Sequence, residues 1–289
     1  MLLRLSLALL FTLVSVSFSA GATLRVFDGI DWRVASSKYD ARLFLKMDNV
    51  TQVEFYKQAG QPIELRLNAP FLIEEAEKAS LFIMSSPLKI SKKKIPVETL
   101  KLVETLEKND PIRLSNGRQI DFTHDVLTLM DAMSKGDWGV VELLLPSGVQ
   151  TVIEIPAIDF INPLRAFNDK RNAFPMLGWE QGKEYTIHFD LARFELTDFQ
   201  KKQLRELVEL INYDGEVVSI EIDGHTDLSG HRLQNLTLSQ QRTQAVKTYL
   251  SGQGLPESMF TAVRHHGQRY PLPKAGAAEN RRVEIRLSR

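Results

Sequence analysis

Asp227 and Arg242 are the two residues whose types and spacing most clearly suggest chemistry. Asp227 ends the turn Gly224-His225-Thr226-Asp227, which follows an apolar strand predicted for residues 217–222. Arg242 comes three residues after Ser239, which we expect to cap the next helix. Ligands of α/β folds favour the crevice beyond the carboxyl ends of strands, and a helix N-terminus favours anionic groups. The pair therefore suits a small zwitterion, with Asp227 facing an ammonium group and Arg242 facing a carboxylate.

The charged residues of this region also have simpler interpretations. Taken singly, Asp227 is an ordinary turn carboxylate and Arg242 an ordinary solvated helix residue. The histidines and carboxylates could be metal ligands, but no His-Glu-x-x-His or comparable spacing occurs. The sequence therefore favours neither a metal site nor a cofactor. The residues considered as ligands are Asp223, His225, Asp227, His265 and His266.

Catalytic arrangements have weaker support. Ser229 and Ser239 lie near His225 in the sequence, but no nucleophile elbow of the G-x-S-x-G type occurs. Asp190 and Glu195 could form the carboxylate pair of a glycosidase, yet they flank an ordinary strand-to-helix connection. We therefore expect a binding protein rather than an enzyme.

The second half of the chain, residues 185–289, alternates strand and helix patterns and predicts an α/β sandwich. One helix should carry an apolar stripe of Leu204, Leu207, Val208 and Ile211. The expected elements are, in order, a strand over 185–189, a helix opened by the capping box Thr197-Asp198-Phe199-Gln200, a strand over 217–222, a helix capped by Ser239 and stopped by Gly252 or Gly254, and strands over 260–263 and 282–287.

The first half, residues 23–178, is mostly short apolar runs between turn formers. Its one clear helical candidate covers residues 126–133. This pattern predicts a mainly-β domain, either an antiparallel sheet or an open barrel. The turn-rich stretch 175–183 is the expected linker to the second domain.

Length and composition narrow the class of protein. The 289 residues suggest two domains, and the equal counts of 36 basic and 36 acidic residues disfavour nucleic-acid binding. Arg4, the apolar stretch 5–18 and Ala20-Gly21-Ala22 predict a signal peptide over residues 1–22. No later segment has about 20 uninterrupted apolar residues, so we expect no membrane span in the mature chain. With no cysteine, both domains must be held by their apolar cores.

The second half resembles the OmpA-like peptidoglycan-binding domain. The resemblance implies that the domain binds the diaminopimelate of the wall peptide, with Asp227 and Arg242 as principal contacts and Thr226, Ser229, Asn235 and Arg282 as neighbours. Asn235 could equally be a loop-capping amide. The residues that carry the resemblance are Phe189-Asp190, Gly224-His225-Thr226-Asp227, Gly230, Asn235, Leu238-Ser239, Arg242 and Asn280-Arg281-Arg282-Val283.

The layout of the chain also resembles the MotY family of sodium-type flagellar motors. The resemblance rests on the signal peptide, the opening Asp31-Trp32-Arg33-Val34-Ala35, the stretch 56–62 and the second half. It implies a periplasmic protein of the T ring at the flagellar basal body. There the first domain would meet a MotX-like protein and the motor, and the second would fix the stator assembly to peptidoglycan. The alternative is a general OmpA-family envelope tether with a non-flagellar partner.

Overall fold

A computed structural model of the chain describes residues 23–24, 29–48, 51–73, 76–87, 89, 93–101, 119–148 and 150–289. The signal peptide expected over residues 1–22 lies outside the described residues. In the part of the chain that is described, no helix has both the length and the apolar character needed to cross a membrane.

Two compact units make up the chain. One combines Met1–Ile30, Lys46–Val53 and Leu67–Ile158, and the other combines Asp31–Leu45, Glu54–Arg66 and Asp159–Arg289. The domain boundary expected between residues 178 and 185 stays a prediction.

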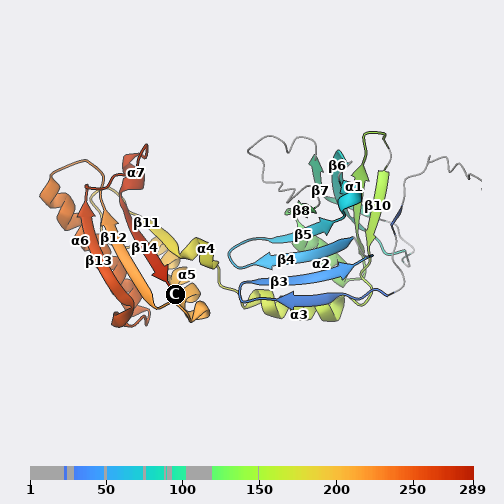
Figure 1. Cartoon of the computed structure of the whole chain (residues 1–289), viewed down its shortest axis with the longest axis horizontal. Coiled ribbons are helices and arrows are strands. Elements are labelled where there is room, and N and C mark those ends of the chain that lie inside the picture. Colours follow the sequence, from blue (N-terminus) through green and yellow to red (C-terminus); the bar gives the residue numbers. More distant parts are fainter. Residues whose placement is uncertain are drawn as a thin grey trace, which may run out of the picture. The chain divides into compact units, whose positions relative to one another are not determined.

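The first unit is built on a five-stranded sheet (Figure 1). Its neighbours are antiparallel except for the parallel pair of β1 and β10. The helix α2 (Val126–Ser134), expected over residues 126–133, buries Leu129 and Met133 and contacts β6 and β9. In spatial order the strands are β1 (Thr23–Leu24), β10 (Gln150–Ile155), β9 (Trp138–Leu144), β6 (Lys78–Met84) and β7 (Lys94–Lys101); the short helix α1 covers Pro70–Ile73.

A second five-stranded sheet combines four strands of residues 33–68 with one strand of residues 119–122. Alternate residues of its strands are buried, as for Ala41, Leu43 and Leu45. A helix not expected from the sequence, α3 (Ile161–Asn172), buries only Leu164 and Phe167, so its apolar stripe is narrow. The first half is therefore mainly β with antiparallel sheets, as predicted. The strand order is β2 (Arg33–Ser36), β3 (Asp40–Lys46), β4 (Gln52–Gln58), β5 (Ile63–Asn68) and β8 (Gln119–Phe122).

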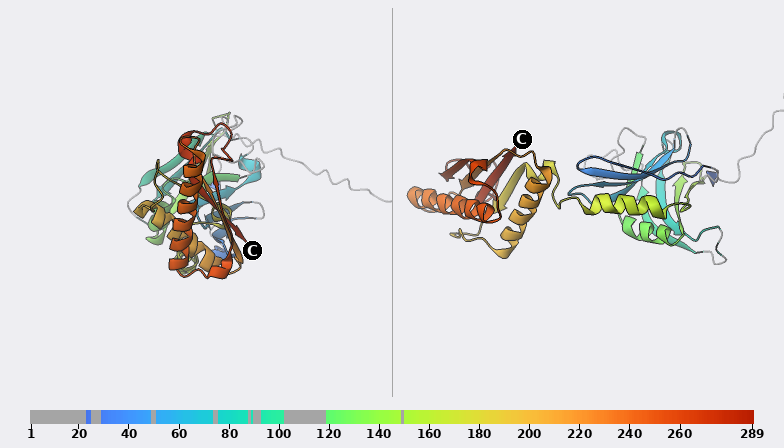
Figure 2. Two further views of the ribbon diagram at one scale, coloured as in Figure 1. Left: turned by 90° about the vertical axis from the view of Figure 1, so that its left-hand side faces the viewer. Right: turned by 90° about the horizontal axis from the view of Figure 1, so that it is seen from below.

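The C-terminal part is a four-stranded sheet covered on one face by α5 and α6 (Figures 1 and 2). The strand β14 is antiparallel to both of its neighbours, and β12 and β13 are parallel. The strand order is β11 (Glu184–His188), β14 (Arg282–Ser288), β12 (Ser219–His225) and β13 (Phe260–Gly267); the helices are α4 (Trp179–Gly182), α5 (Asp198–Asp214), α6 (Arg232–Gly252), the 3₁₀ turn η3 (Glu257–Met259) and α7 (Ala277–Asn280).

The helix α5 begins where its capping box predicts. The Thr197 hydroxyl accepts from the backbone N–H of Gln200 at 3.3 Å, and the Gln200 side chain accepts from the backbone N–H of Thr197 at 2.7 Å. Its apolar stripe packs on Ile220 and Ile222 of β12 within one continuous core. The helix ends at Gly215, whose φ of 66° is a conformation that glycine adopts without strain.

The expected start of the next helix at Ser239 is wrong. The helix α6 begins at Arg232, so Ser239 and Arg242 lie in its interior. The face of α6 that meets the sheet is largely polar there, with Asn235, Ser239 and Arg242 buried. Because no apolar stripe marks these first turns, hydrophobic periodicity does not show them. The end of α6 at Gly252 is as predicted.

Candidate functional site

A cavity of about 390 Å³ lies beyond the carboxyl end of β12, where the α/β topology predicts a ligand site. We call it the Asp227 cavity. The turn after β12, the first turns of α6, the loop after β11 and the residue before β14 all contribute to it. Its lining residues are Leu191, Ala192, Thr226, Asp227, Ser229, Gly230, Gln234, Asn235, Leu238, Arg242 and Arg281.

Asp227 supplies the negative charge of the cavity. Its side chain is buried, and its Oδ1 accepts hydrogen bonds from the backbone N–H of Ser229 at 3.0 Å and from the Ser229 hydroxyl. Its Oδ2 lies 3.1 Å from Nη1 of Arg281. Burial disfavours the charged form, but the bonds from Ser229 and Arg281 outweigh it and hold the pKa of Asp227 below its usual range. Asp227 is therefore ionised at neutral pH.

Arg242 is fully buried, and its guanidinium donates hydrogen bonds to three backbone carbonyls. Its Nε donates to the carbonyl of Arg193 at 2.8 Å, and its Nη2 donates to that of Asp190 at 2.9 Å. Its Nη1 donates to the carbonyl of His225 at 3.1 Å. A guanidinium carries five N–H donors, so the three carbonyl bonds occupy three of them and leave two. Burial, with the charge of Arg281, lowers the pKa of Arg242 to about 10, so it stays charged at neutral pH.

The reach of Arg242 to the end of β12 depends on Gly224. A Cβ atom at Gly224 would lie 2.6 Å from the carbonyl oxygen of Ser239 and 2.5 Å from Cγ2 of Thr243, both on α6. Any larger residue would therefore push α6 away from β12. Ser239 fixes the same approach, because its hydroxyl accepts from the backbone N–H of Gly267 at 3.0 Å. The close packing of helix and strand positions the guanidinium.

Arg281 is the charged residue of the cavity that was missed in the sequence. Besides its contact with Asp227, its Nε donates to the carbonyl of Phe189 at 3.1 Å. The sequence signal was the Asn280-Arg281-Arg282-Val283 motif, from which Arg282 was selected instead. Arg281 lies just before β14 and lines the cavity, whereas Arg282, the first residue of β14, lies on the open face of the sheet, so only one of the two neighbouring arginines reaches the cavity.

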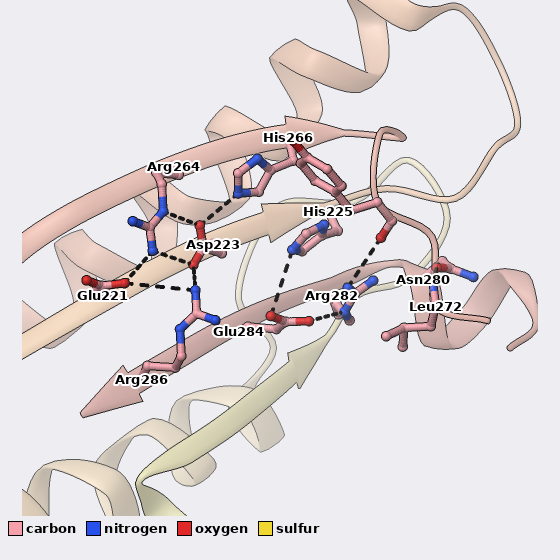
Figure 3. A network of polar contacts seen from close by, with 11 residues as sticks. Glu221, Asp223, His225, Arg264, His266, Leu272, Asn280, Arg282, Glu284 and Arg286 are labelled. Carbon is pink, nitrogen blue, oxygen red and sulfur yellow. Dashed lines mark hydrogen bonds and ion pairs between the residues drawn. The ribbon is translucent and has the colours of Figure 1, made fainter. Parts of the chain in front are cut away.

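The other expected residues divide into cavity and non-cavity positions. Thr226, Ser229 and Asn235 line the cavity together with Asp227. The amide of Asn235 donates to the carbonyl of Ser229 at 2.8 Å and to Oε1 of Gln268 at 2.6 Å, which are the contacts of a loop-capping amide. Arg282 does not line the cavity. It lies on the open face of the sheet, where its Nε donates to Glu284 at 2.6 Å (Figure 3).

That open face carries a dense polar network centred on Asp223 (Figure 3). The buried carboxylate accepts from Nε of Arg264 at 2.6 Å, from the ring of His266 at 2.7 Å and from Arg286. Burial alone would raise its pKa, but Arg264 and His266 hold the pKa of Asp223 well below its usual range. Asp223 is thus fully engaged by these three side chains. Among the described residues, no group of three or more His, Cys, Asp or Glu is arranged to hold a metal ion.

The ring of His225 lies beside this network without a hydrogen bond to any described residue. Its ring is buried, neither ring nitrogen has a hydrogen-bond partner within the described residues, and it stacks on His266 with ring centroids 5.0 Å apart. Its Nε2 lies 4.0 Å from Glu284. Burial and then the charge of Arg282 lower the pKa of His225 to about 4, so the ring is neutral at neutral pH.

The residues considered for catalysis are engaged elsewhere. Ser229 is bonded to Asp227, and Ser239 is bonded to the backbone of Leu236 and Gly267. Neither serine is bonded to His225 in the described structure. Neither Asp190 nor Glu195 is among the residues that line the Asp227 cavity. The geometry around the cavity therefore favours binding over acyl or glycosyl transfer.

Comparison with known proteins identifies the C-terminal part. Residues 188–284 match the model of the OmpA family. This domain is OmpA-like. The match contains the whole of β12, α6 and β13, which build most of the Asp227 cavity.

Two relatives are similar to parts of the chain. Sodium-type flagellar protein MotY of Vibrio parahaemolyticus is 24% identical over 141 residues, which are 47% of this chain and 48% of that protein. Peptidoglycan-associated lipoprotein of Buchnera aphidicola is 30% identical over 83 residues, which are 29% of this chain and 47% of that protein. The chain spans about half the length of these two relatives. It is thus similar to MotY and carries an OmpA-like domain.

One solved structure is similar to part of the chain. The crystal structure of the peptidoglycan-associated lipoprotein from Burkholderia pseudomallei is 26% identical, covers 36% of this chain and 89% of that chain, and has a TM-score of 0.33.

Proposed function

We propose that this chain is a non-enzymatic anchor that ties part of the flagellar motor to peptidoglycan by holding diaminopimelate in the Asp227 cavity. The observation that carries the proposal is the meeting of Asp227 with Arg242 and Arg281 in one cavity of an OmpA-like domain. The free end of diaminopimelate carries an ammonium and a carboxylate on one carbon. Such an end needs both signs of charge within a short distance, and this cavity offers both.

Binding of that end exchanges one internal ion pair for two external ones. The ligand ammonium takes the place of Arg281 at Asp227, and the ligand carboxylate accepts from Arg281 and from the remaining N–H groups of Arg242. Each charge-assisted contact contributes roughly 1.5–3 kcal/mol, and the broken Arg281–Asp227 pair offsets part of it. The net affinity for the amino-acid end alone is therefore about micromolar to millimolar.

Co-sedimentation of the protein with purified sacculi tests the binding step. Asp227→Asn keeps the shape of the side chain and removes its charge, so we expect at least tenfold weaker binding, since loss of one partner of a bound charge pair costs about 2–5 kcal/mol. Asp198→Asn is the matched control, because Asp198 is fully exposed at the start of α5. Sacculi with lysine in place of diaminopimelate lack the second carboxylate and should bind weakly. Equal binding of all samples would contradict the site.

The flagellar assignment draws on the similarity to MotY. The chain then works in the periplasm at the flagellar basal body, beside a MotX-like protein and the stator proteins. Deletion of the gene should slow or stop swimming while flagellar filaments still assemble. Normal swimming of the deletion strain would contradict this assignment and leave the wall-binding step standing.

A general envelope tether is the second candidate. It is favoured by relatives outside the flagellum, among them the peptidoglycan-associated lipoproteins and outer membrane protein A of Shimwellia blattae, which is 31% identical over 126 residues. This candidate predicts the same binding to sacculi without accumulation of a fluorescent fusion at flagellar bases.

A further inference from the structure

A second cavity of about 590 Å³ runs along α6 next to the Asp227 cavity. We call it the Gln244 groove. No acidic or basic side chain lines it, in contrast to the Asp227 cavity with its three charges. Its lining residues are Phe194, Leu196, Gln240, Gln241, Gln244, Ala245, Thr248 and Tyr249.

The groove joins an apolar floor to a row of neutral hydrogen-bonding groups. The α6 positions fall into two stripes with a spacing of four residues, Gln240-Gln244-Thr248 and Gln241-Ala245-Tyr249. Gln240 and Gln241 are exposed, and neither side chain bonds to another residue that the structure describes. The Gln244 amide donates to Thr248 at 3.1 Å, which leaves its carbonyl oxygen available.

The groove continues the Asp227 cavity along the same helix and the same loop. The loop after β11 gives Leu191 and Ala192 to the Asp227 cavity, then Phe194 and Leu196 to the groove. Arg242 holds this loop at the carbonyl of Arg193, the residue between the two pairs. At 1.5 Å per residue, the α6 positions 234–249 that line the two cavities extend over about 22 Å. A chain longer than one amino-acid end can therefore contact both.

We propose that the Gln244 groove binds the neutral N-acetylated sugar chain of the same wall polymer whose peptide enters the Asp227 cavity. This inference rests on the proposed function. Sugar hydroxyl and acetamide groups pair with the glutamine amides and the Thr248 hydroxyl, and the apolar faces of the sugar rings pack on Phe194 and Tyr249. A second peptide would bring carboxylates, and no residue that lines the groove carries a positive charge to pair with them; the nearby Arg205 donates to the Tyr249 hydroxyl at 3.0 Å.

Calorimetric titration of the full chain with four probes tests the inference. The probes are the diaminopimelate-containing stem tripeptide, the same tripeptide attached to its disaccharide, the same tripeptide cross-linked to a second stem peptide, and glycan strands stripped of peptide. Two additional neutral hydrogen bonds should make the disaccharide-tripeptide bind roughly tenfold more tightly than the tripeptide. The double variant Gln241→Ala, Gln244→Ala should lose this gain and bind the tripeptide as the wild type does.

Two further variants distinguish sugar binding in the groove from effects of substitution elsewhere on α6. Gln253→Ala is the matched control, because Gln253 is exposed just beyond the end of α6 and should keep the gain. Thr248→Trp fills the groove from an exposed helix position and should abolish the gain without loss of the fold.

The outcomes separate this inference from the proposed function. The inference about the groove would be overturned if the wild type bound the tripeptide and the disaccharide-tripeptide with equal affinity. It would also be overturned if the double variant kept the full gain in affinity from the disaccharide. A gain with a cross-linked peptide but none with the sugar would also overturn it. If the tripeptide does not bind at all, the proposed function fails. In that case, binding of stripped glycan to the wild type but not to the double variant would still support sugar binding in the groove. If stripped glycan did not bind either, the inference about the groove would fail as well.

Discussion

His225 should make the fold less stable as the pH falls from 7 to 5. The ring is 5% exposed and unbonded, and it faces Arg282 and Glu284 from β14, His266 from β13 and Asp223 from its own strand. Burial and Arg282 disfavour the proton, whereas Glu284 and Asp223 only partly favour it. The result is a pKa of about 4 in the folded protein, against 6.5 for an unperturbed histidine.

The sign and size of the effect follow from the pKa of His225 in the two states. Because its folded pKa is depressed, the unfolded chain takes up the proton first, so stability is present above pH 6.5 and is lost as the pH falls towards 4. The full loss is about 3 kcal/mol, and about 2 kcal/mol of it falls between pH 7 and pH 5. Aspartates with an ordinary or lowered pKa hold their charge through this range, so they contribute little to it.

Urea unfolding at pH 7 and pH 5 measures the effect, with His225→Phe as the variant. Phenylalanine keeps an aromatic ring beside His266 and removes the titrating group, so the free energy of unfolding should change about 2 kcal/mol less between the two pH values than in the wild type. The reasoning is refuted if the variant has the same pH dependence as the wild type. It is also refuted if the imidazole resonances of His225 in the wild type titrate near 6.5.

Three substitutions, measured by denaturant unfolding, test the packing of α6 on the sheet and the cap of α5. Gly224→Ala should cost about 1–3 kcal/mol because its Cβ meets the backbone of α6, whereas Gly252→Ala, with open space around it, should not destabilise. Ser239→Ala should lower the free energy of unfolding by about 1–3 kcal/mol, because the N–H of Gly267 loses its buried hydrogen-bond partner. A loss below about 0.5 kcal/mol, as for a surface substitution, would contradict a stabilising role for this hydrogen bond. Thr197→Ala should cost about 1 kcal/mol through the lost cap of α5, with Thr237→Ala, exposed within α6, as the control that leaves capping intact.

The elements that could be predicted from the sequence are those whose signals are local. The capping box Thr197–Gln200 fixes the start of α5, because two side chains there satisfy backbone groups within one turn. The apolar runs of β12 and β14 locate their strands, because side chains at alternate positions are buried in a common core. Residues 126–133 have a helical stripe that is wide enough to detect.

The parts that were missed depend on contacts made far along the chain. The start of α6 is hidden because Asn235, Ser239 and Arg242 replace an apolar stripe, and their partners lie in β12, β13 and the loop after β11. The choice between Arg281 and Arg282 depends on which face of β14 each side chain takes. The sequence cannot show which of the two adjacent arginines faces the cavity until the register of β14 is known.

The three carbonyl bonds of Arg242 have a mechanical consequence. A load applied to a ligand on this guanidinium would pass at once into α6, the end of β12 and the loop that contains Asp190 and Arg193. Two of these bonds join Arg242 to residues about 50 positions earlier in the chain, so the force would not act on a single turn of the backbone. The wall anchor proposed above would gain from such sharing, because a force spread over several segments must break several bonds before any one segment can separate.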